Sequence, residues 1–530
     1  MSRRVDRGHL NHGRVLRLSA SRYRDQPCLE FEGNTITFGE LNRQVNQVAR
    51  TLAERGVVRG TRVMILAANS PDYVRVMFAA AKLGAICVPC NTALLPQDLA
   101  FVITAARPAL ILADRTYHER AVAAVSHVEQ RPLPDVVRMP GKGVAGDALR
   151  FDHLDDADLP EDDLRDDDPA VYLFTSGSMG TPKAVVKSFA NLAWHAINRQ
   201  ISQPRHEGDR ELFVLPLSGV GFGNFLVTDV MTGTLCVLEP SFDPVRAARL
   251  LRETVVTHVF MAPTMMMAID AAVEDATFPD VRVVETAYEV TGPQRQRIAE
   301  MFPRAQILYS YGCTEGSMAR APADAFLEDP SCVGFASGLD EYRVVPTEDA
   351  DSHLGAIEVT GPTVMQGYLT GPGQSPSAAV GDDGWFDTGD LGRFDQGGRL
   401  HFGGRQKDMI KSGAVNVYAW DVEAGLASHP AVHQVAVIGV ADDYWGEAVA
   451  AVIEPRAGHQ ITLEEIRAHA TQNLAGFRRP KTYFLVDRMP LNATGKIAKG
   501  ELRDLVLTRE ILPLTATSAA PSDGSEAAAR

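Results

Sequence analysis

The sequence predicts an α/β protein with a large N-terminal domain of two helix-flanked β-sheets plus a barrel-like subdomain, followed by a small α+β C-terminal domain. Short β-rich apolar runs alternate with helical patterns through the first 310 residues. Gly-rich, strand-like pieces replace that alternation between residues 330 and 405, and the pattern changes again after residue 405. At 530 residues, the chain has enough apolar material for more than one buried core.

The first 310 residues show the βαβ rhythm of buried parallel sheets. One helix is expected to begin at residue 72 and another to cover residues 293–302. The acidic stretch 155–168 is expected to form a solvated surface loop that ends where a strand begins. The predicted strands cover residues 62–67, 85–90, 108–113, 170–174, 258–263, 281–287 and 306–312.

The rest of the chain divides into two further parts. The pieces GAIEVTGP and RLHFGGR favour an antiparallel or barrel-like subdomain. Beyond it, the sequence predicts a helix over 422–429, strands over 433–440, 448–455 and 481–487, and a helix opened by a Thr462–Glu465 capping box. The predicted ranges are an N-terminal domain over 1–404, a C-terminal domain over 405–513 and a disordered tail over 514–530.

Composition excludes several classes of function. Fifty-two Lys and Arg against 67 Asp and Glu give a net charge of −15, which argues against nucleic acid as a partner. Lys82 interrupts the longest apolar stretch, so no membrane span is expected. The Arg-rich start is followed by no apolar core, so we expect no secretory signal and a cytoplasmic protein.

The cysteines and histidines indicate no metal or disulfide chemistry. Six scattered cysteines are too few for a disulfide framework. Cys87 and Cys90 have the spacing of a redox motif, but their apolar surroundings favour a buried strand. The fourteen histidines form no HExxH motif, so a catalytic metal site held by the protein alone is not expected.

A loop rich in glycine and hydroxyl residues follows the predicted strand 170–174. Its glycines allow backbone N–H groups to surround an anion, its hydroxyls add donors, and its closing lysine adds positive charge. It is not a Walker A loop, and an ordinary Ser/Gly-rich turn is the alternative. The candidate phosphate-binding residues are Thr175, Ser176, Gly177, Ser178, Gly180 and Lys183.

Two further motifs carry groups suited to a nucleotide. In YGCTEG, Tyr311 is suited to stack on a purine, Thr314 to hold a phosphate and Glu315 to bind Mg²⁺. The segment follows a predicted strand, at the strand end where α/β proteins form ligand crevices. In GWFDTGD, Asp390 is placed in a tight turn and is suited to accept hydrogen bonds from ribose hydroxyls. Each motif alone is also compatible with a simple turn.

The order and spacing of the motifs together resemble the adenylate-forming superfamily of acyl- and aryl-CoA synthetases, stand-alone adenylation domains and luciferases. The resemblance covers nearly the whole chain and favours an acid–CoA ligase. The segments that carry it are FEGNTITFGEL (31–41), GVVRGTRVMILAANSPD (56–72), LGAICVPCN (83–91), the loop at 175–183, YGCTEG (311–316), GWFDTGDLG (384–392), GGRQKDMIKSGAVNVYAWDVE (403–423), VAVIGVADDYWGE (435–447) and PLNATGKIAKGELR (490–503).

The resemblance implies a two-step reaction. A carboxylate first attacks ATP, which gives an acyl-AMP and pyrophosphate, and the acyl group then passes to the thiol of CoA or of a carrier protein. ATP, Mg²⁺ and CoA are therefore expected as cofactors and co-substrate. The C-terminal domain is expected to be a mobile lid that rotates about Lys407 between the two steps.

The resemblance also assigns roles to residues of this chain. Lys496 matches the lysine that bridges the attacking carboxylate and the α-phosphate, and it is the predicted catalytic residue together with Glu315 and Thr175. Asp390 and Arg405 match the ribose-binding pair. The adenine-flanking segment corresponds to Ala287, Tyr288 and Glu289, the rest of the ATP site includes Gly312, and the pantetheine tunnel corresponds to Lys411, Ser412, Gly413 and Ala414.

Among the departures from the family that bear on the substrate, one segment is the most informative. Ser218 and Gly219 stand where acyl- and aryl-CoA synthetases commonly have a Phe-His pair. The same segment lacks the Asp that anchors an α-ammonium group, so an α-amino acid is disfavoured as substrate. The predicted acid pocket consists of Ser218, Gly219, Tyr288, Gly312 and Cys313.

Three hypotheses of function follow. The first is an acid–CoA ligase for an aryl or acyl carboxylate. The second is an adenylating enzyme whose acceptor is a carrier protein or an amine, or whose substrate is an unusual oxyanion such as nitrite. The third is a catalytically silent nucleotide-binding protein. The sequence alone determines neither the acid nor the oligomeric state.

Overall fold

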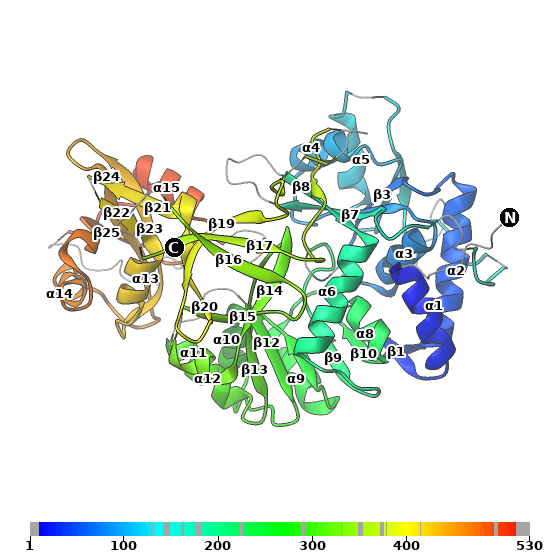
Figure 1. Ribbon diagram of the computed structural model, residues 1–530, viewed down its shortest axis with the longest axis horizontal. Helices are drawn as coiled ribbons and strands as arrows, with labels where there is room; N and C mark the ends of the chain where they lie inside the picture. The colour runs from blue at the N-terminus through cyan, green and yellow to red at the C-terminus, as the bar shows by residue number, and fades with distance from the viewer. Residues whose placement is uncertain are drawn as a thin grey trace, which may run out of the picture.

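Two large sheets and one small sheet organise the chain (Figure 1). The structure is a computed structural model. It describes residues 10–129, 131–140, 149–153, 155–160, 164–175, 183–219, 221, 226–287, 292–329, 331–347, 353–371, 376–377, 379–413, 415–491 and 497–515. Within these ranges, no helix is long and apolar enough to cross a membrane.

The first sheet has seven strands in the order β18-β8-β7-β4-β3-β5-β6, of which β7, β4, β3, β5 and β6 run parallel. Its helices cover both faces, and α2 begins at a capping box formed by Thr37 and Glu40. The strands are β3 Arg62–Leu66, β4 Ile86–Pro89, β5 Leu110–Ala113, β6 Asp135–Arg138, β7 Pro169–Thr175, β8 Lys183–Ser188 and β18 Gly367–Tyr368, and the helices are α1 His12–Arg22, α2 Phe38–Glu54, α3 Pro71–Lys82, α4 Pro96–Ala106, α5 His118–Ser126 and α6 Phe189–Ser202.

The second sheet joins parallel and antiparallel parts in the order β16-β17-β19-β20-β15-β14-β13-β12-β11-β9-β10-β1-β2. Strands β9 to β13 and β1 form its parallel part, and the strands from residue 316 onward extend it as an antiparallel piece. The strands are β1 Pro27–Phe31, β2 Asn34–Thr37, β9 Arg210–Phe213, β10 Leu235–Leu238, β11 His258–Phe260, β12 Val283–Ala287, β13 Gln306–Cys313, β14 Gly316–Ala321, β15 Cys332–Ala336, β16 Glu341–Pro346, β17 Gly355–Thr360, β19 Phe386–Phe394 and β20 Leu400–Arg405, and the helices are α8 Leu226–Thr232, α9 Pro244–Glu253, α10 Pro263–Ala272, α11 Gly292–Met301 and α12 Ala323–Glu328.

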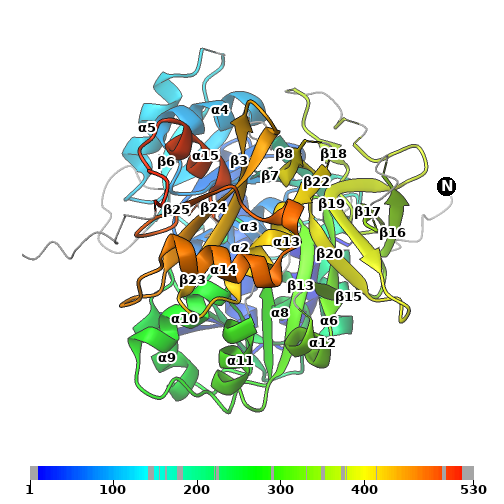
Figure 2. The same ribbon diagram turned by 90° about the vertical axis from the view of Figure 1, so that its left-hand side faces the viewer.

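The third sheet belongs to the small C-terminal unit, which Figure 2 turns toward the viewer. Two short 3₁₀ helices, Gln406–Asp408 and Gly476–Arg478, lie before and within this unit. Its elements are β21 Met409–Ser412, β22 Val415–Tyr418, β23 Val432–Asp442, β24 Gly446–Pro455, β25 Thr482–Leu485, α13 Ala419–Ala427, α14 Leu463–Asn473 and α15 Lys499–Leu507.

The C-terminal core extends further along the chain than we expected. Leu514 is buried in the core with Val437 and Tyr483, and its N–H donates to the Tyr483 carbonyl at 2.7 Å. The expected start of a disordered tail at residue 514 is therefore too early, because this apolar side chain has a place in the core. Residues 516–530 of that expected tail lie outside the described residues.

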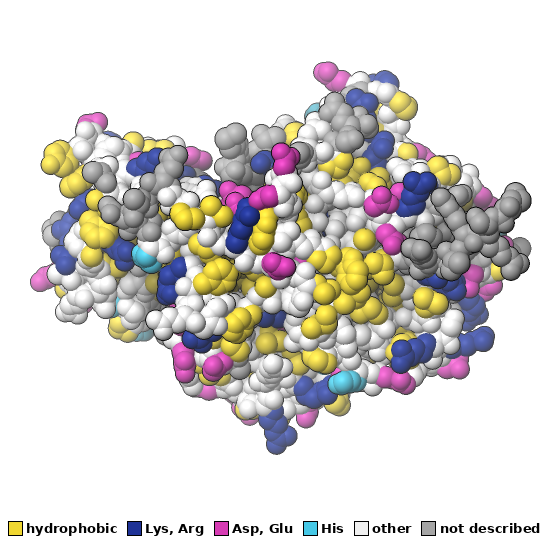
Figure 3. All heavy atoms as spheres, in the orientation of Figure 1, with side chains coloured by type: hydrophobic (Ala, Val, Ile, Leu, Met, Phe, Trp, Pro, Cys, Tyr) yellow, Lys and Arg dark blue, Asp and Glu magenta, His cyan; other side chains and the backbone are white. Residues whose placement is uncertain are grey.

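The surface carries both signs of charge. Figure 3 shows Lys and Arg interspersed with Asp and Glu over the face of Figure 1, with hydrophobic side chains gathered near α6. The exposed apolar residues include Ile201 at the end of α6 and Phe335 and Leu339 near β15. All of the described cysteines are unpaired, and Cys87 lies buried in β4, where burial raises its pKa to about 12.

A buried histidine makes the fold sensitive to acid. The His12 ring packs between Phe78 and Phe189, with ring centroids 5.6 and 5.4 Å away, and burial lowers its pKa from 6.5 to about 4. The unfolded chain therefore binds a proton between pH 6.5 and 4 that the folded chain excludes, so stability is lost as the pH falls through this window.

We expect His12→Phe to reduce this acid sensitivity. The free energy of unfolding, measured in urea at pH 7.5 and pH 5, should fall by about 2 kcal/mol less in the variant than in the wild type. His459→Phe, the same substitution at an exposed histidine, is the matched control. An equal loss in His12→Phe and the wild type would show that His12 does not carry this sensitivity.

Candidate active site

The two ends of the predicted phosphate loop lie side by side in one hairpin. Thr175 is the last residue of β7 and pairs with Lys183, the first residue of β8. The Thr175 hydroxyl donates to the Lys183 carbonyl at 3.5 Å. The hairpin therefore places a hydroxyl and a lysine at the same end of the seven-stranded sheet. The loop residues predicted between them, Ser176, Gly177, Ser178 and Gly180, lie outside the described residues.

Glu315 lies in the turn between β13 and β14, and its carboxylate is held by a residue of the other large sheet. The Tyr368 hydroxyl donates to Glu315 Oε1 at 2.8 Å, and Lys183 Nζ lies 4.8 Å from the centroid of the Tyr368 ring. The backbone N–H of Met365 donates to the Glu315 carbonyl at 2.6 Å. One aromatic side chain thus joins the predicted phosphate lysine to the predicted Mg²⁺ ligand.

The predicted ribose pair lies next to Tyr311. Asp390 and Arg405 face each other across β19 and β20, with Arg405 Nε 3.4 Å from Asp390 Oδ1. The Tyr311 hydroxyl donates to Asp390 Oδ2 at 2.8 Å. Burial, together with the nearby Asp390 carboxylate, raises the pKa of Tyr311, so its hydroxyl remains a donor. These contacts fix both oxygens of a mostly buried carboxylate at the end of β13.

The remaining predicted nucleotide residues follow the ends of neighbouring strands. Ala287 ends β12 and pairs with Ser310 of β13, directly before Tyr311. Gly312 and Cys313 end β13, and Thr314 begins the turn to Glu315. Burial raises the pKa of Cys313 to about 12, so its side chain is a thiol at neutral pH. Tyr288 and Glu289 lie outside the described residues.

The segment that departs from the family leaves open space. Ser218 and Gly219 follow Leu217, which belongs to the same core cluster against which Ala287 packs. Gly219 is exposed, and its N–H donates to the Pro216 carbonyl at 3.2 Å. A Cβ at Gly219 would approach only that carbonyl oxygen, at 3.7 Å. The described part of the chain thus leaves room for a larger side chain here.

The predicted hinge and pantetheine segment lie at the start of the C-terminal unit. Lys407 is exposed in the 3₁₀ helix that separates β20 from β21. The Lys411 N–H donates to Glu447 at 2.9 Å, and the Gly413 N–H donates to the Trp445 carbonyl at 2.6 Å. Ser412 is buried in β21 and pairs with Gly446, so this segment lies against the β23–β24 hairpin. Ala414 and the predicted catalytic Lys496 lie outside the described residues.

Two residues near Glu315 were not predicted from the sequence. No sequence pattern indicates Tyr368, because its strand is only two residues long and pairs with the distant strand β8. Lys187 is the second: it is buried in β8, lies 2.9 Å from His195 Nε2 and donates to the Thr363 carbonyl at 2.8 Å. Burial lowers the pKa of Lys187 to about 8. A lysine inside the apolar run AVVKSF was the available signal.

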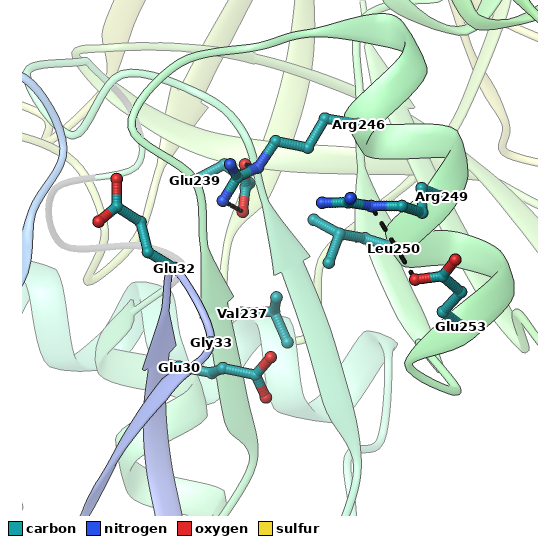
Figure 4. A pocket seen from close by; sticks show the side chains of 9 residues that line it. All are labelled: Glu30, Glu32, Gly33, Val237, Glu239, Arg246, Arg249, Leu250 and Glu253. Carbon is teal, nitrogen blue, oxygen red and sulfur yellow. Dashed lines mark hydrogen bonds and ion pairs between the residues drawn. The ribbon is translucent and has the colours of Figure 1, made fainter.

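A cavity of about 340 Å³ lies elsewhere on the fold, between the β1–β2 hairpin, β10 and α9 (Figure 4). Its arginines are paired within the cavity wall, Arg246 with Glu239 and Arg249 with Glu253. Strand β10 is three strands from β12 in the sheet, roughly 15 Å at the usual strand spacing. The cavity is therefore separate from the residues around Glu315.

Comparisons with known proteins agree with this arrangement. A family model described as "AMP-binding enzyme" matches residues 16–369, and one described as "AMP-binding enzyme C-terminal domain" matches residues 421–496. A feruloyl-CoA synthase from Amycolatopsis sp. is 32% identical over 481 residues, which cover 89% of this chain and 94% of the relative.

Solved structures extend the comparison to the fold. The o-succinylbenzoate CoA synthetase MenE from Bacillus subtilis, in complex with its acyl-adenylate intermediate, matches with a TM-score of 0.80 and 26% identity, covering 92% of this chain and 98% of that one. The amide bond synthetase McbA from Marinactinospora thermotolerans matches with a TM-score of 0.79 and 26% identity, covering 93% and 99%.

The fold and the residues gathered around Glu315 define an enzyme of the adenylate-forming class. The chain belongs to the AMP-binding enzyme family, because the two family models together match more than half of its length. The family predicted from the motifs is therefore confirmed, as is the predicted fold class of a large α/β domain with a smaller C-terminal domain.

Proposed function

We propose that the protein is an ATP-dependent acid–CoA ligase for an aryl or acyl carboxylate. One observation carries the proposal: Lys183 and Glu315 are joined through Tyr368, beside a second group formed by Tyr311, Asp390 and Arg405. A cation and a carboxylate at one position suit a metal-bound triphosphate, and a fixed carboxylate at the other suits ribose hydroxyls. The names of the feruloyl-CoA synthase and of MenE support an acid–CoA reaction.

The first step must bring two anions together. The carboxylate of the acid attacks the α-phosphorus of ATP, the bond to pyrophosphate breaks, and acyl-AMP remains. Positioned cations offset the repulsion between the substrate carboxylate and the triphosphate. We assign this role to Lys183 and Lys496. A lysine about 4 Å from a phosphate oxygen contributes roughly 4 kcal/mol at an effective dielectric constant near 20.

The donor set around Glu315 fits a magnesium ion that is bound partly by its nucleotide. Glu315 Oε1 is already engaged by Tyr368, which leaves Oε2 for the ion. Among the described residues, no group of three or more His, Cys, Asp or Glu side chains could hold a metal alone. A site with one carboxylate and substrate phosphates is the usual arrangement for Mg²⁺. When bound, Mg²⁺ neutralises charge on the phosphates.

The second step transfers the acyl group to the CoA thiol. The thiol sulfur attacks the acyl carbon, AMP leaves, and the thiol proton is lost. We propose that the C-terminal domain, residues 405–513, rotates about Lys407, withdraws Lys496 and brings in the segment 411–414. The position of Lys407 between β20 and β21, at the change from one sheet to another, supports this assignment.

A second candidate function has an acceptor other than CoA. Gly219 offers no side chain where CoA-forming relatives commonly have an aromatic-His pair, and the space around its Cβ position is open. The amide bond synthetase McbA shares the fold, so an amine acceptor is compatible with this architecture. A carrier-protein thiol and the activation of an oxyanion such as nitrite belong to the same alternative.

Pyrophosphate release tests these proposals. The purified protein is incubated with ATP and Mg²⁺ over a panel of aryl and aliphatic acids and nitrite, with and without CoA, and the products are identified by mass. Acid-dependent release that yields a CoA thioester supports the ligase. Release without thioester supports an amine or carrier-protein acceptor. Binding of ATP without release from any acid would indicate a catalytically silent protein.

Gly219→His should change which acid is preferred. The new side chain enters open space beside the predicted acid pocket, and a change of this size in a pocket alters relative kcat/KM between acids by roughly tenfold or more. The KM for ATP should change less than twofold. Competition between pairs of acids, followed by product mass, measures the preference.

The matched control is Gly476→His, the same substitution at an exposed glycine of the C-terminal unit with open space around it. It should leave the acid preference as in the wild type. Loss of ATP binding in Gly219→His, with the acid preference unchanged, would contradict the placement of residues 218–219 beside the acid.

A further inference from the structure

Tyr368 is fixed in place by the shortest strand of the seven-stranded sheet. Gly367 and Tyr368 of β18 pair with Val186 and Val185 of β8, and the Tyr368 carbonyl accepts a hydrogen bond from the Ser377 N–H at 2.8 Å. Gly367 has φ +140°, and a Cβ there would overlap the Ser377 carbonyl oxygen. This register sets Tyr368 across from Val185, two residues after Lys183.

From this position Tyr368 contacts two groups of opposite charge. Its hydroxyl donates to Glu315 Oε1 at 2.8 Å, and the face of its ring lies 4.8 Å from Lys183 Nζ. A hydrogen bond restricts the carboxylate to one orientation, and a cation–π contact restrains a flexible lysine that would otherwise sample many rotamers. One side chain therefore sets the geometry between the carboxylate and the ammonium.

The backbone around Tyr368 holds the same turn. Met365, three residues earlier, donates its N–H to the Glu315 carbonyl at 2.6 Å. Asn191 Nδ2 donates to the Pro362 and Val364 carbonyls at 2.8 and 2.9 Å, and Lys187 donates to the Thr363 carbonyl. The segment 362–368 is thus anchored on β8 and α6. It donates hydrogen bonds to both the backbone and the side chain of Glu315.

We infer that Tyr368 is a positioning residue that couples the metal ligand Glu315 to the phosphate lysine Lys183. Its hydroxyl holds Oε1, which would leave Oε2 for the ion, and its ring restrains the ammonium that would contact the triphosphate. The inference rests on the proposed function, because both partners act on metal-bound ATP. It assigns to Tyr368 a role in Mg²⁺ use that packing alone does not provide.

Two substitutions separate the hydroxyl from the ring. Tyr368→Phe removes the hydrogen bond to Glu315 and keeps the ring beside Lys183 and within the cluster of Val185, Val364 and Phe386. Tyr368→Leu removes both contacts. Tyr73→Phe is the matched control, since it deletes a buried hydroxyl that lies in α3 and has no hydrogen-bond partner among the described residues.

The first measurement is acid-dependent ATP–pyrophosphate exchange titrated with free Mg²⁺. Loss of a hydrogen bond to a charged group should raise the half-saturating Mg²⁺ concentration of Tyr368→Phe on the order of tenfold. Its KM for ATP at saturating Mg²⁺ should stay within twofold of wild type. Tyr368→Leu should raise both values, and Tyr73→Phe neither. Unchanged Mg²⁺ dependence in Tyr368→Phe would overturn the inference.

The second measurement does not need turnover. The midpoint temperature of thermal unfolding is measured with ATP alone and with ATP plus Mg²⁺. The difference between the two values is the Mg²⁺-dependent part of the rise. Tyr368→Phe should lose most of this part and keep the rise caused by ATP alone. If wild type shows no exchange with any acid, the proposed function fails while this readout still decides the role of Tyr368. If the Mg²⁺-dependent rise in Tyr368→Phe equals that of the wild type, Tyr368 only packs against its neighbours and the inference is wrong.

Discussion

Lys496→Ala should slow acyl-AMP formation by ~10²–10³ or more while leaving thioester formation from supplied acyl-AMP far less affected. The ammonium of Lys496 is proposed to bridge two anions only as the new bond forms, so its loss acts on that transition state. In the proposed second step the C-terminal domain has turned Lys496 away, so its charge should no longer be needed.

The measurement compares the two half-reactions in one preparation. Pyrophosphate exchange reports the first, and release of CoA thioester from synthetic acyl-AMP reports the second. Arg488→Ala removes an exposed cation from the same domain and should leave both rates near wild type. Equal losses in both half-reactions for Lys496→Ala would contradict the assignment of this lysine to adenylation.

Local patterns predicted most of the elements that position the site. The strand expected over 62–67 is β3 Arg62–Leu66, and the capping box at Thr462 and Glu465 opens α14 as expected. The helix expected over 422–429 begins earlier, since α13 starts at Ala419. This start places Trp420 against Gly404. Apolar periodicity and capping residues depend on near neighbours, so a single sequence contains them.

Contacts between distant segments could not be predicted in this way. Strand β18 has two residues and no periodicity, yet it provides Tyr368 to Glu315. The motifs identified Lys183 and Glu315 as separate candidates, but nothing in their spacing indicates that one aromatic ring lies between them. Pairing across about 180 residues is decided by the whole fold rather than by local preference.

A buried cluster of charged side chains next to the second sheet was also not predicted from the sequence. Arg199 of α6 contacts Glu211 of β9 at 2.6 Å and Glu285 of β12 at 3.2 Å. Arg205 contacts Glu211 at 2.8 Å and Asp229 of α8 at 3.4 Å. All five side chains are almost fully buried. The cluster connects α6 and α8 to the parallel strands whose ends carry the candidate site.

The pKa values of the two carboxylates next to Arg205 are shifted in opposite directions. Burial raises the pKa of Asp229 well above its usual value, and the neighbouring Glu211 raises it further. Burial also opposes ionisation of Glu211, but Arg199 and Arg205 together hold its pKa well below the usual range. The directions of the two shifts make Glu211 the charged partner of both arginines and favour the neutral form of Asp229.

This difference predicts opposite outcomes for two amide substitutions of the same kind. Glu211→Gln leaves two buried guanidinium groups facing a neutral amide, which should cost about 3–5 kcal/mol of unfolding free energy. In Asp229→Asn, a neutral amide of nearly the same shape takes the place of a side chain whose neutral form burial favours, and the change should cost less than about 1 kcal/mol. Urea unfolding at pH 7.5 compares the two variants with wild type. Equal destabilisation by both would mean that Asp229 shares the negative charge, because only an ionised Asp229 would lose an ion pair on becoming an amide.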